Sequence, residues 1–338
     1  MTQIPSPKTY RRVVLVRRPP GEPAEADFRV EDVATPEPGS NQVLVRVIYL
    51  SLDPYMRGRM RDAASYAAPV GLGEVMPGGT VGEVVQSNHP GFKPGEIVED
   101  RLGWQEYALS NGTTLRKIDP ALAPISTANG VLGMPGMTAW FGLLEIGQPK
   151  PGETVVVSAA SGAVGQVVGQ LAKLAGCRVV GIAGGAAKCA FIKNELGFDA
   201  AVDYKAPEFR EQLAQACAGG VDIYFDNTAG TISDAVMTHL KVGARVIVCG
   251  TASVPSWEPP PQGPRVERHM LVKRARMQGF VIFDHPEHHA PALRDLAGWI
   301  RSGKLSYVED VLDGLDKAPD AIAGLYRGEN LGKRLIRL

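Results

Sequence analysis

The stretch Val155-Val156-Val157-Ser158-Ala159-Ala160-Ser161-Gly162-Ala163-Val164-Gly165 decides how this chain folds. Its three valines predict a buried strand, and the small residues and glycines after them predict a tight turn. Apolar residues then recur with helical spacing through Leu174, which predicts a helix. A turn of this kind lets backbone N–H groups approach a pyrophosphate at the helix N-terminus. The alternative is a plain strand–helix turn in an α/β protein.

Composition limits the classes of protein to consider. A chain of 338 residues exceeds one ordinary core, so we expect two domains. Lys plus Arg and Asp plus Glu balance at 36 each, which argues against nucleic-acid and membrane-surface partners. There is no apolar run of 18 residues and no apolar signal region at the start. We therefore expect no membrane span and a cytoplasmic location.

The sequence predicts no metal site. The four cysteines, Cys177, Cys189, Cys217 and Cys249, lie far apart without a CxxC pair, so we expect buried free thiols. Zinc needs three or four Cys, His or acidic ligands. The cluster His285-x-x-His288-His289 could form a weak site, but a solvated loop after a strand ending at Phe283 is the preferred interpretation.

Residues 10–130 have the pattern of a β-rich domain. Short alternating segments are separated by Gly- and Pro-rich turns, which predicts a small barrel-like sheet. The predicted strands cover residues 13–16, 28–33, 42–50, 79–85, 95–100 and 104–109.

Strands and helices alternate after residue 130, which predicts a parallel sheet covered by helices on both faces. A helix over 135–144 comes first. The predicted strands are 154–158, 178–183, 200–203, 221–226, 244–249 and 277–283, with helices beginning near Gly162, Lys188, Pro207, Thr231 and Arg265. The proline-rich segment 253–264 is expected to be a long loop. Strands at 304–310 and 332–338 around a helix at 317–326 predict a return to the first domain. The domains are thus 1–130 with 301–338, and 131–300.

The second strand of the parallel sheet indicates which dinucleotide binds. An acidic residue at its end would hold the ribose hydroxyl of NAD, whereas a cation suits the 2′-phosphate of NADP. This strand ends Ala183-Gly184-Gly185 without an acid, and Lys188 follows. The pattern favours NADP(H), with Lys188 as the phosphate ligand. The alternative for Lys188 is an ordinary solvated helix lysine.

Two tyrosines are candidate proton donors. A phenol can hydrogen-bond a developing enolate and protonate carbon. Tyr55 and Tyr66 both lie in loop-like sequence of the β-rich domain, although either could instead be a packing residue.

Six motifs together resemble one family. They are 52–60 (LDPYMRGRM), 133–139 (GMPGMTA), 159–165 (AASGAVG), 224–227 (YFDN), 276–280 (RMQGF) and 328–333 (GENLGK). The chain resembles the medium-chain dehydrogenase/reductase superfamily, and within it the zinc-free, NADPH-dependent double-bond reductases. That group includes prostaglandin reductase (leukotriene B4 dehydrogenase) and curcumin reductase.

The resemblance implies a Rossmann-type doubly wound domain that binds NADPH and a GroES-like β-barrel-like domain that binds substrate and carries catalysis. It implies reduction of the C=C bond of α,β-unsaturated carbonyls, usually by a homodimer. The cofactor-binding residues would be Gly162, Ala163, Val164, Gly165, Lys188, Tyr204, Asn227, Cys249, Gly250, Thr251, Phe280, Val281, Ile282 and Asn330.

One departure affects the proton donor. Mammalian members carry a tyrosine eight positions before the residue that matches Phe280, where this chain has Val272. Curcumin-reductase-like members have a tyrosine in the loop that matches Ser65-Tyr66, so the resemblance favours Tyr66 over Tyr55. Two other functions stay open: an NADPH:quinone reductase on the same fold, and a non-catalytic nucleotide-binding protein.

Overall fold

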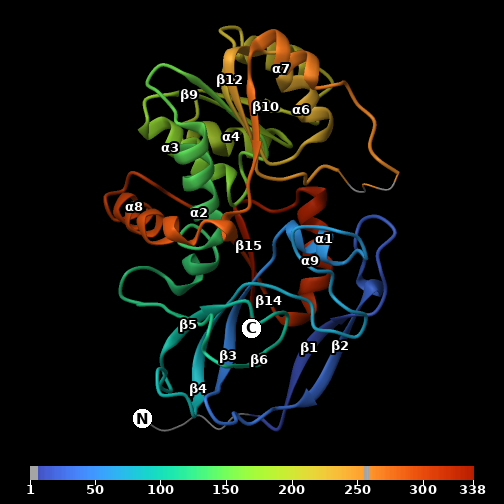
Figure 1. Cartoon of the computed structure of the whole chain (residues 1–338), viewed down its shortest axis with the longest axis vertical. Helices are drawn as coiled ribbons and strands as arrows, with labels where there is room; N and C mark the ends of the chain where they lie inside the picture. Colours follow the sequence, from blue (N-terminus) through green and yellow to red (C-terminus); the bar gives the residue numbers. More distant parts are fainter. Residues whose placement is uncertain (1–6, 255–256, 258) are drawn as a thin grey trace. The chain divides into compact units, whose positions relative to one another are not determined.

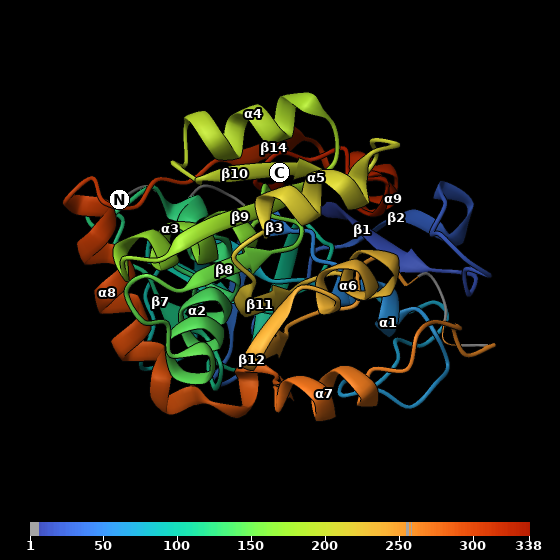
Figure 2. The ribbon, with the colours of Figure 1, turned by 90° about the horizontal axis from the view of Figure 1, so that it is seen from above.

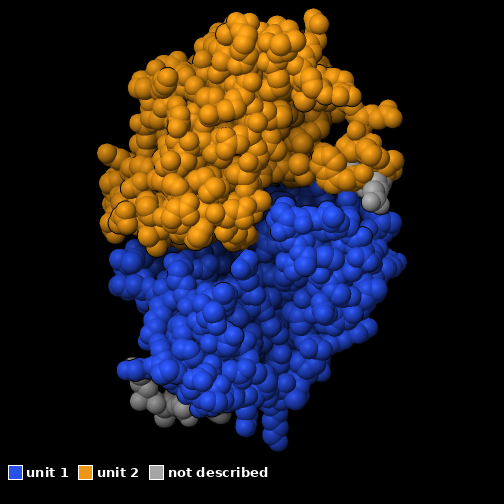
Figure 3. All heavy atoms as spheres, in the orientation of Figure 1, with its two compact units in different colours: residues 1–130, 309–338 blue, residues 131–308 orange. Residues whose placement is uncertain are grey.

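The computed structural model describes residues 7–254, 257 and 259–338. Its contacts divide the chain into two compact units, coloured separately in Figure 3. Unit 1 is Met1–Gly130 with Glu309–Leu338, and unit 2 is Val131–Val308. None of the described helices has the length and apolar character that crossing a membrane would require.

Unit 2 is built on a six-stranded sheet in which every pair of strands is parallel. The spatial order is β10-β9-β8-β11-β12-β13. The strands are β8 Thr154–Val157, β9 Arg178–Ala183, β10 Ala200–Asp203, β11 Val221–Asp226, β12 Leu240–Val248 and β13 Arg276–Gly279. This is the predicted Rossmann-type doubly wound sheet.

Helices cover both faces of this sheet, with α2 and α3 on one side and α5 and α6 on the other (Figure 2). The two faces follow from alternation along β8, where Val156 joins the core formed with Leu213 of α5 and Val236 of α6. The helices are α2 Met134–Trp140, α3 Gly165–Leu174, α4 Ala186–Asn194, α5 Phe209–Ala216, α6 Gly230–Met237, α7 Glu267–Lys273 and α8 His289–Arg301. A π-helical turn, Phe141–Gly147, continues α2.

Near the end of unit 2 one predicted strand was too long and one helix was not predicted. The strand expected over 277–283 ends at Gly279, because its partner β12 ends at Val248, opposite that glycine. Short 3-10 turns follow, and then α8, which the sequence analysis did not predict. Its signal was Ala292 and Leu296, two buried residues four positions apart.

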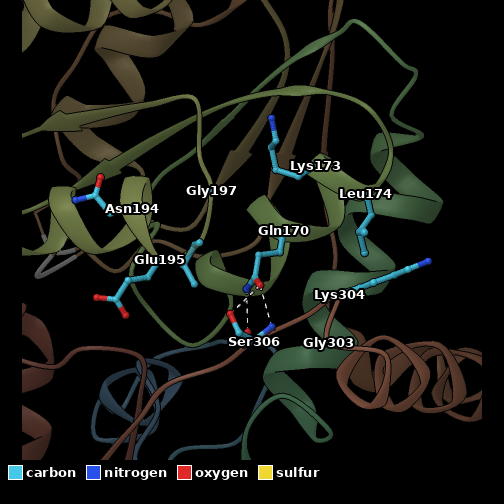
Figure 4. Close-up of a pocket in the computed structure, with 10 residues that line it drawn as sticks. Gln170, Lys173, Leu174, Asn194, Glu195, Gly197, Gly303, Lys304 and Ser306 are labelled. Carbon is cyan, nitrogen blue, oxygen red and sulfur yellow. Dashed lines mark hydrogen bonds between the residues drawn. The ribbon is translucent and has the colours of Figure 1, made fainter.

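The strand expected over 304–310 begins only at Glu309, because two glutamines of α3 hold the preceding residues. Gln166 bonds both backbone groups of Val308, at 3.0 and 3.2 Å. Gln170 accepts from the Ser306 N–H and donates to its carbonyl, both at 2.9 Å (Figure 4). These side-chain amides replace the strand partner that the segment would otherwise need.

Unit 1 is mostly antiparallel. A two-stranded sheet pairs β1 Thr9–Leu15 with β2 Phe28–Ala34, and a seven-stranded sheet runs β14-β15-β3-β4-β5-β7, with β6 on β3. The strands are β3 Val43–Ser51, β4 Thr80–Ser87, β5 Ile97–Asp100, β6 Tyr107–Ser110, β7 Arg116–Lys117, β14 Glu309–Asp313 and β15 Lys333–Arg337. The helices are α1 Tyr55–Arg59 and α9 Ala318–Arg327 (Figure 1).

Candidate active site

The glycine turn of unit 2 joins β8 to α3, and the start of α3 packs directly against the backbone of the turn. Ala159 has a φ of 48°, and its carbonyl accepts the Gly162 N–H at 2.9 Å. A Cβ on Gly165 would lie 2.3 Å from that carbonyl oxygen, so a side chain there would collide with backbone. Gly162, Ala163 and Val164 are partly exposed, and Val164 at the N-cap has no side-chain oxygen to cap α3. The turn therefore presents backbone N–H groups as an anion cradle requires.

A second corner forms where β9 and β10 end. Tyr204 packs against the backbone of Gly184, where a Cβ would come within 2.8 Å of the tyrosine ring. Lys188 lies half-buried in the first turn of α4. The Asp203 carboxylate accepts the backbone N–H groups of Gly185, at 2.8 Å, and of Lys205, at 2.9 Å. The structure thus brings Gly184 and Tyr204 together.

Lys205 is a residue of this corner that the sequence analysis did not include among the ligands. Its side chain also approaches Gly184, with Cε 3.0 Å from the position a Cβ would take, and its ammonium lies 5.9 Å from the centroid of the Tyr204 ring. The signal was its place next to Tyr204. The corner therefore holds Lys205, and Lys188 lies in the first turn of the helix that follows it.

Asp226, at the end of β11, organises the loops beside the glycine turn. Its buried carboxylate accepts the Tyr224 hydroxyl at 2.9 Å and the backbone N–H groups of Thr228 and Ala229 at 3.0 and 2.8 Å. Burial, and then the charge of Asp226, raise the pKa of Tyr224 well above its usual value, so this phenol stays a donor.

Asn227 and the loop after β12 are fixed to the same strand ends. The Asn227 side chain donates to the Ser158 carbonyl at 2.8 Å, and its backbone N–H donates to the Ser158 hydroxyl at 2.9 Å. The Asp226 carbonyl accepts the N–H groups of Cys249 and Gly250 at 2.8 and 3.1 Å. Burial, reinforced by Asp226, raises the pKa of the Cys249 thiol to about 12. The glycine turn, Asn227 and the segment leading to Thr251 therefore meet at the carboxyl ends of the strands, where ligands bind in such sheets.

Phe280 begins the segment after β13, and its ring packs on unit 2 itself. A Cβ on Gly142 would lie 2.8 Å from Phe280, and the Phe280 and Phe141 ring centroids are 5.5 Å apart. Val281 follows, and Ile282 is buried. Phe280 is thus braced from one side by Gly142 and Phe141.

The histidines after Phe283 do not form the expected solvated loop. His285 stacks on Phe141 with centroids 4.2 Å apart, and His288 meets the same ring edge-on at 5.0 Å. His285 links two 3-10 turns and His288 ends the second, just before α8, and the aromatic ring of Phe141 gives both histidines a packing surface. Among the described residues, no three His, Cys, Asp or Glu side chains gather as ligands for a metal.

A surface hollow of about 370 Å³ lies elsewhere on unit 2, beside the C-terminal half of α3 (Figure 4). Its lining includes Lys173, Glu195 and Lys304 but none of the predicted cofactor residues. Gln170 also lines this hollow, and its side-chain amide is hydrogen-bonded to the backbone of Ser306. The hollow therefore lies where the segment before β14 is held against α3.

Unit 1 holds the candidate proton donors. Tyr55 is the first residue of α1, and burial, with the charge of Asp53 second, raises its pKa above the usual range. Tyr66 is 65% exposed. Burial raises the pKa of Tyr55 and of Tyr326, and Tyr66 adds the smallest contribution to each. The structure thus adds Tyr326, which the sequence analysis missed, to the two predicted tyrosines.

Asn330 also belongs to unit 1, in the segment between α9 and β15. Its side-chain amide donates to the Gly332 carbonyl at 2.8 Å. Its contact with a cofactor stays a prediction, as do the individual roles of the residues described above.

Comparisons with known proteins bear on the whole chain. Residues 11–118 match a family described as the N-terminal domain of oxidoreductase, and residues 163–298 match one described as zinc-binding dehydrogenase. The chain is 49% identical to NADPH-dependent curcumin reductase of Escherichia coli, covering 97% of this chain and 96% of that protein. It is 42% identical to the NADP(+)-dependent 2-alkenal reductase of Nicotiana tabacum, covering 96% of each. The crystal structure of CurA from Vibrio vulnificus with NADPH is 50% identical, with a TM-score of 0.93, covering 97% of this chain and 98% of that one.

The two-unit fold and these likenesses define the class: the chain is an oxidoreductase of the medium-chain dehydrogenase/reductase superfamily. Within that superfamily it belongs to the zinc-free double-bond reductase group, together with curcumin reductase, 2-alkenal reductase and prostaglandin reductase.

Proposed function

We propose that this protein is an NADPH-dependent reductase of the C=C bond in α,β-unsaturated carbonyl compounds. The observation that carries this proposal is the likeness, over nearly the full length, to reductases whose names specify NADPH and alkenal or curcumin. The cofactor, when bound, supplies a hydride to the β-carbon of the substrate. The protein then has to stabilise the enolate and deliver one proton to the α-carbon.

The residues of unit 2 fit NADPH chemically. The turn Gly162–Gly165 offers backbone N–H groups where a side chain on Gly165 could not be accommodated, which suits a pyrophosphate. The corner at Gly184 combines Tyr204 with Lys188 and Lys205, and β9 ends without an acidic residue. Two ammonium groups there suit a 2′-phosphate better than a free ribose hydroxyl.

Tyr66 of unit 1 is the preferred proton donor. The residue is 65% exposed, which leaves it accessible to a substrate. Tyr55 is half-buried, and its raised pKa makes it a weak acid. In the proposed reaction the Tyr66 hydroxyl hydrogen-bonds the enolate oxygen and serves as the acid for the α-carbon.

The decisive experiment is a panel of acceptors with NADPH: short enals, aryl enones, dienones, quinones and 15-oxo lipids. Turnover of enals or enones is expected. Turnover of quinones alone would favour the quinone reductase. NADPH binding without turnover on any acceptor would favour a non-catalytic protein, and turnover of an alcohol with NADP⁺ would refute the reaction class.

A variant tests the proton donor. Tyr66→Phe should lower kcat for an enone about 100-fold, in the range that a positioned general acid contributes. Wild-type kcat in this variant would remove Tyr66 from the mechanism.

We further propose that the protein works as a homodimer joined through β13. All four residues of this edge strand are exposed, so its free backbone edge can pair with a second copy. Apolar side chains accompany it, with Leu271 78% exposed and Val272 and Met277 also exposed. Light scattering should give twice the mass of one chain, and Leu271→Lys with Met277→Lys should give monomers.

Residence in the cytoplasm completes the proposal. All four cysteines are free thiols, which suits a reducing compartment. Fractionation of cells producing the protein tests this.

A further inference from the structure

The helix that carries Tyr55 begins without a capping side chain of its own. Pro54 occupies the N-cap of α1 and has no oxygen on its side chain. Tyr326, from α9, supplies the missing contacts: its hydroxyl accepts the Arg57 N–H at 3.1 Å and donates to the Pro54 carbonyl at 2.8 Å. The Arg57 guanidinium also lies over the Tyr326 ring, 4.2 Å from its centroid. One phenol thereby bridges the Arg57 N–H and the Pro54 carbonyl, in addition to the backbone bond between these two residues at 3.3 Å.

The residues just before α1 are held by the same C-terminal segment. The Lys333 ammonium donates to the Leu52 carbonyl at 2.9 Å and to the Asp53 carboxylate at 2.6 Å. The other Asp53 oxygen accepts the Ser51 hydroxyl. Lys333, Asp53 and Ser51 are all buried, so this anchor excludes water. Lys333 thus fixes Leu52 and Asp53, and Tyr326 fixes the next residues, at the start of α1.

Tyr326 belongs to the same unit as the other candidate phenol, Tyr66. Tyr66 contributes, after burial and other charges, to the raised pKa of Tyr55 and of Tyr326, and the three phenols come from three separate segments of unit 1. The Tyr326 hydroxyl is already committed to two backbone partners. It is therefore suited to orient its neighbours rather than to exchange a proton with a substrate.

We propose that Tyr326 is a positioning residue for catalysis: by capping α1 it fixes Tyr55, and with it the surroundings of Tyr66. This inference rests on one part of the proposed function, namely that a tyrosine of unit 1 donates the proton.

Tyr326→Phe tests the proposal, because it removes the hydroxyl and keeps the ring. We expect kcat for an enone to fall about 3- to 10-fold, in keeping with the loss of a group that only orients a donor. KM for NADPH should stay within about twofold, since ground-state cofactor binding is untouched. Amide hydrogen exchange in the peptide covering residues 52–60 should become about 10-fold faster, reporting local opening of α1.

Tyr10→Phe is the matched control. It removes a phenol hydrogen bond of the same unit, from the Tyr10 hydroxyl to Gln105 at 3.2 Å, far along the chain from α1. It should leave kcat and the exchange of residues 52–60 unchanged.

The Tyr66→Phe background supplies the sharper readout. If Tyr326 acts through the donor, Tyr326→Phe should change kcat by less than about twofold once Tyr66 has lost its hydroxyl, because coupled residues are not additive. Faster exchange with unchanged kcat would overturn the proposal by leaving Tyr326 a purely structural role. A fall in kcat without faster exchange, or a full additional fall in the Tyr66→Phe background, would overturn it as well. Failure of the proposed function is distinct: the unsubstituted protein would then show no turnover of enals or enones with NADPH, whatever Tyr326→Phe does to the exchange of residues 52–60.

Discussion

Unit 2 and unit 1 make their candidate sites from different materials. In unit 2 the proposed phosphate cradle is backbone, shaped by small residues within the single stretch 155–165. In unit 1 the phenols come from α1, from the chain after it and from α9. The buried ion pair between Lys333 of β15 and Asp53 holds the residues just before α1 in place. The first site depends on the absence of side chains, and the second depends on their presence.

The difference predicts different responses to substitution. A backbone cradle should fail when atoms are added, since they collide with a carbonyl that cannot move far. A site supported by side chains should fail when a partner is removed, since its buried counterpart is left unsatisfied.

The largest expected effect is in unit 1, at the buried ion pair. Lys333→Met should lower the free energy of unfolding by about 3–5 kcal/mol, because Asp53 would keep a buried charge without its partner. Urea unfolding measures this. Lys317→Met is the control, because Lys317 lies exposed, 3.8 Å from Asp316, and should cost less than about 1 kcal/mol. Equal costs for the two variants would contradict the comparison.

The next effect is in unit 2, where adding one methyl group should suffice. Gly165→Ala should destabilise the protein by about 1–3 kcal/mol and weaken NADPH binding at least 10-fold, because its Cβ would lie 2.3 Å from the Ala159 oxygen. Thermal unfolding and NADPH fluorescence titration measure the two quantities. Gly298→Ala, in α8, meets no atom within 4 Å and should be stabilising by about 0.5–1 kcal/mol. A harmless Gly165→Ala would show that the turn has room for a side chain.

A smaller effect should separate cofactor binding from stability in unit 2. Lys188→Ala should raise KM for NADPH about 10-fold by removing a charge-assisted bond to the 2′-phosphate, with little change for NADH. Steady-state kinetics with both cofactors measure this, and Lys193→Ala on the same helix is the control. Unchanged NADPH affinity in Lys188→Ala would contradict its role as the 2′-phosphate ligand. Lys205 would then be the candidate, and Lys205→Ala should raise KM for NADPH instead.

The smallest effect concerns alkaline pH and one buried thiol of unit 2, Cys217. Burial raises the pKa of Cys217 from 9.0 to about 11, so the folded protein holds this proton more tightly than the unfolded chain. The resulting stability is present below pH 9 and is lost as the pH rises toward 11, on the order of 1 kcal/mol by pH 10. Cys217→Ala should show a shallower decline in Tm over this range. An identical decline would exclude the thiol as its source.

The same contrast explains what could be predicted from the sequence. The strand, turn and helix around the glycine turn could be predicted because they are contiguous, so their spacing is visible in eleven residues. Tyr326 and Lys333 escaped prediction because their partners Pro54 and Asp53 lie some 270 or more residues away, and no local pattern records such a contact. The strand expected over 304–310 began late for a similar reason, since Gln166 and Gln170 satisfy its backbone from a helix more than 130 residues earlier.

The insertion of β15 between β14 and β3 has a consequence for synthesis on the ribosome. Unit 2 is translated whole before residues 309–338 emerge, so it can fold first. Until those residues arrive, the edge of β3 over Tyr49–Ser51 is open and the Asp53 carboxylate lacks its ammonium. The nascent chain therefore carries an unpaired strand edge through the translation of all of unit 2, which makes unit 1 the part most exposed to misassembly during biosynthesis.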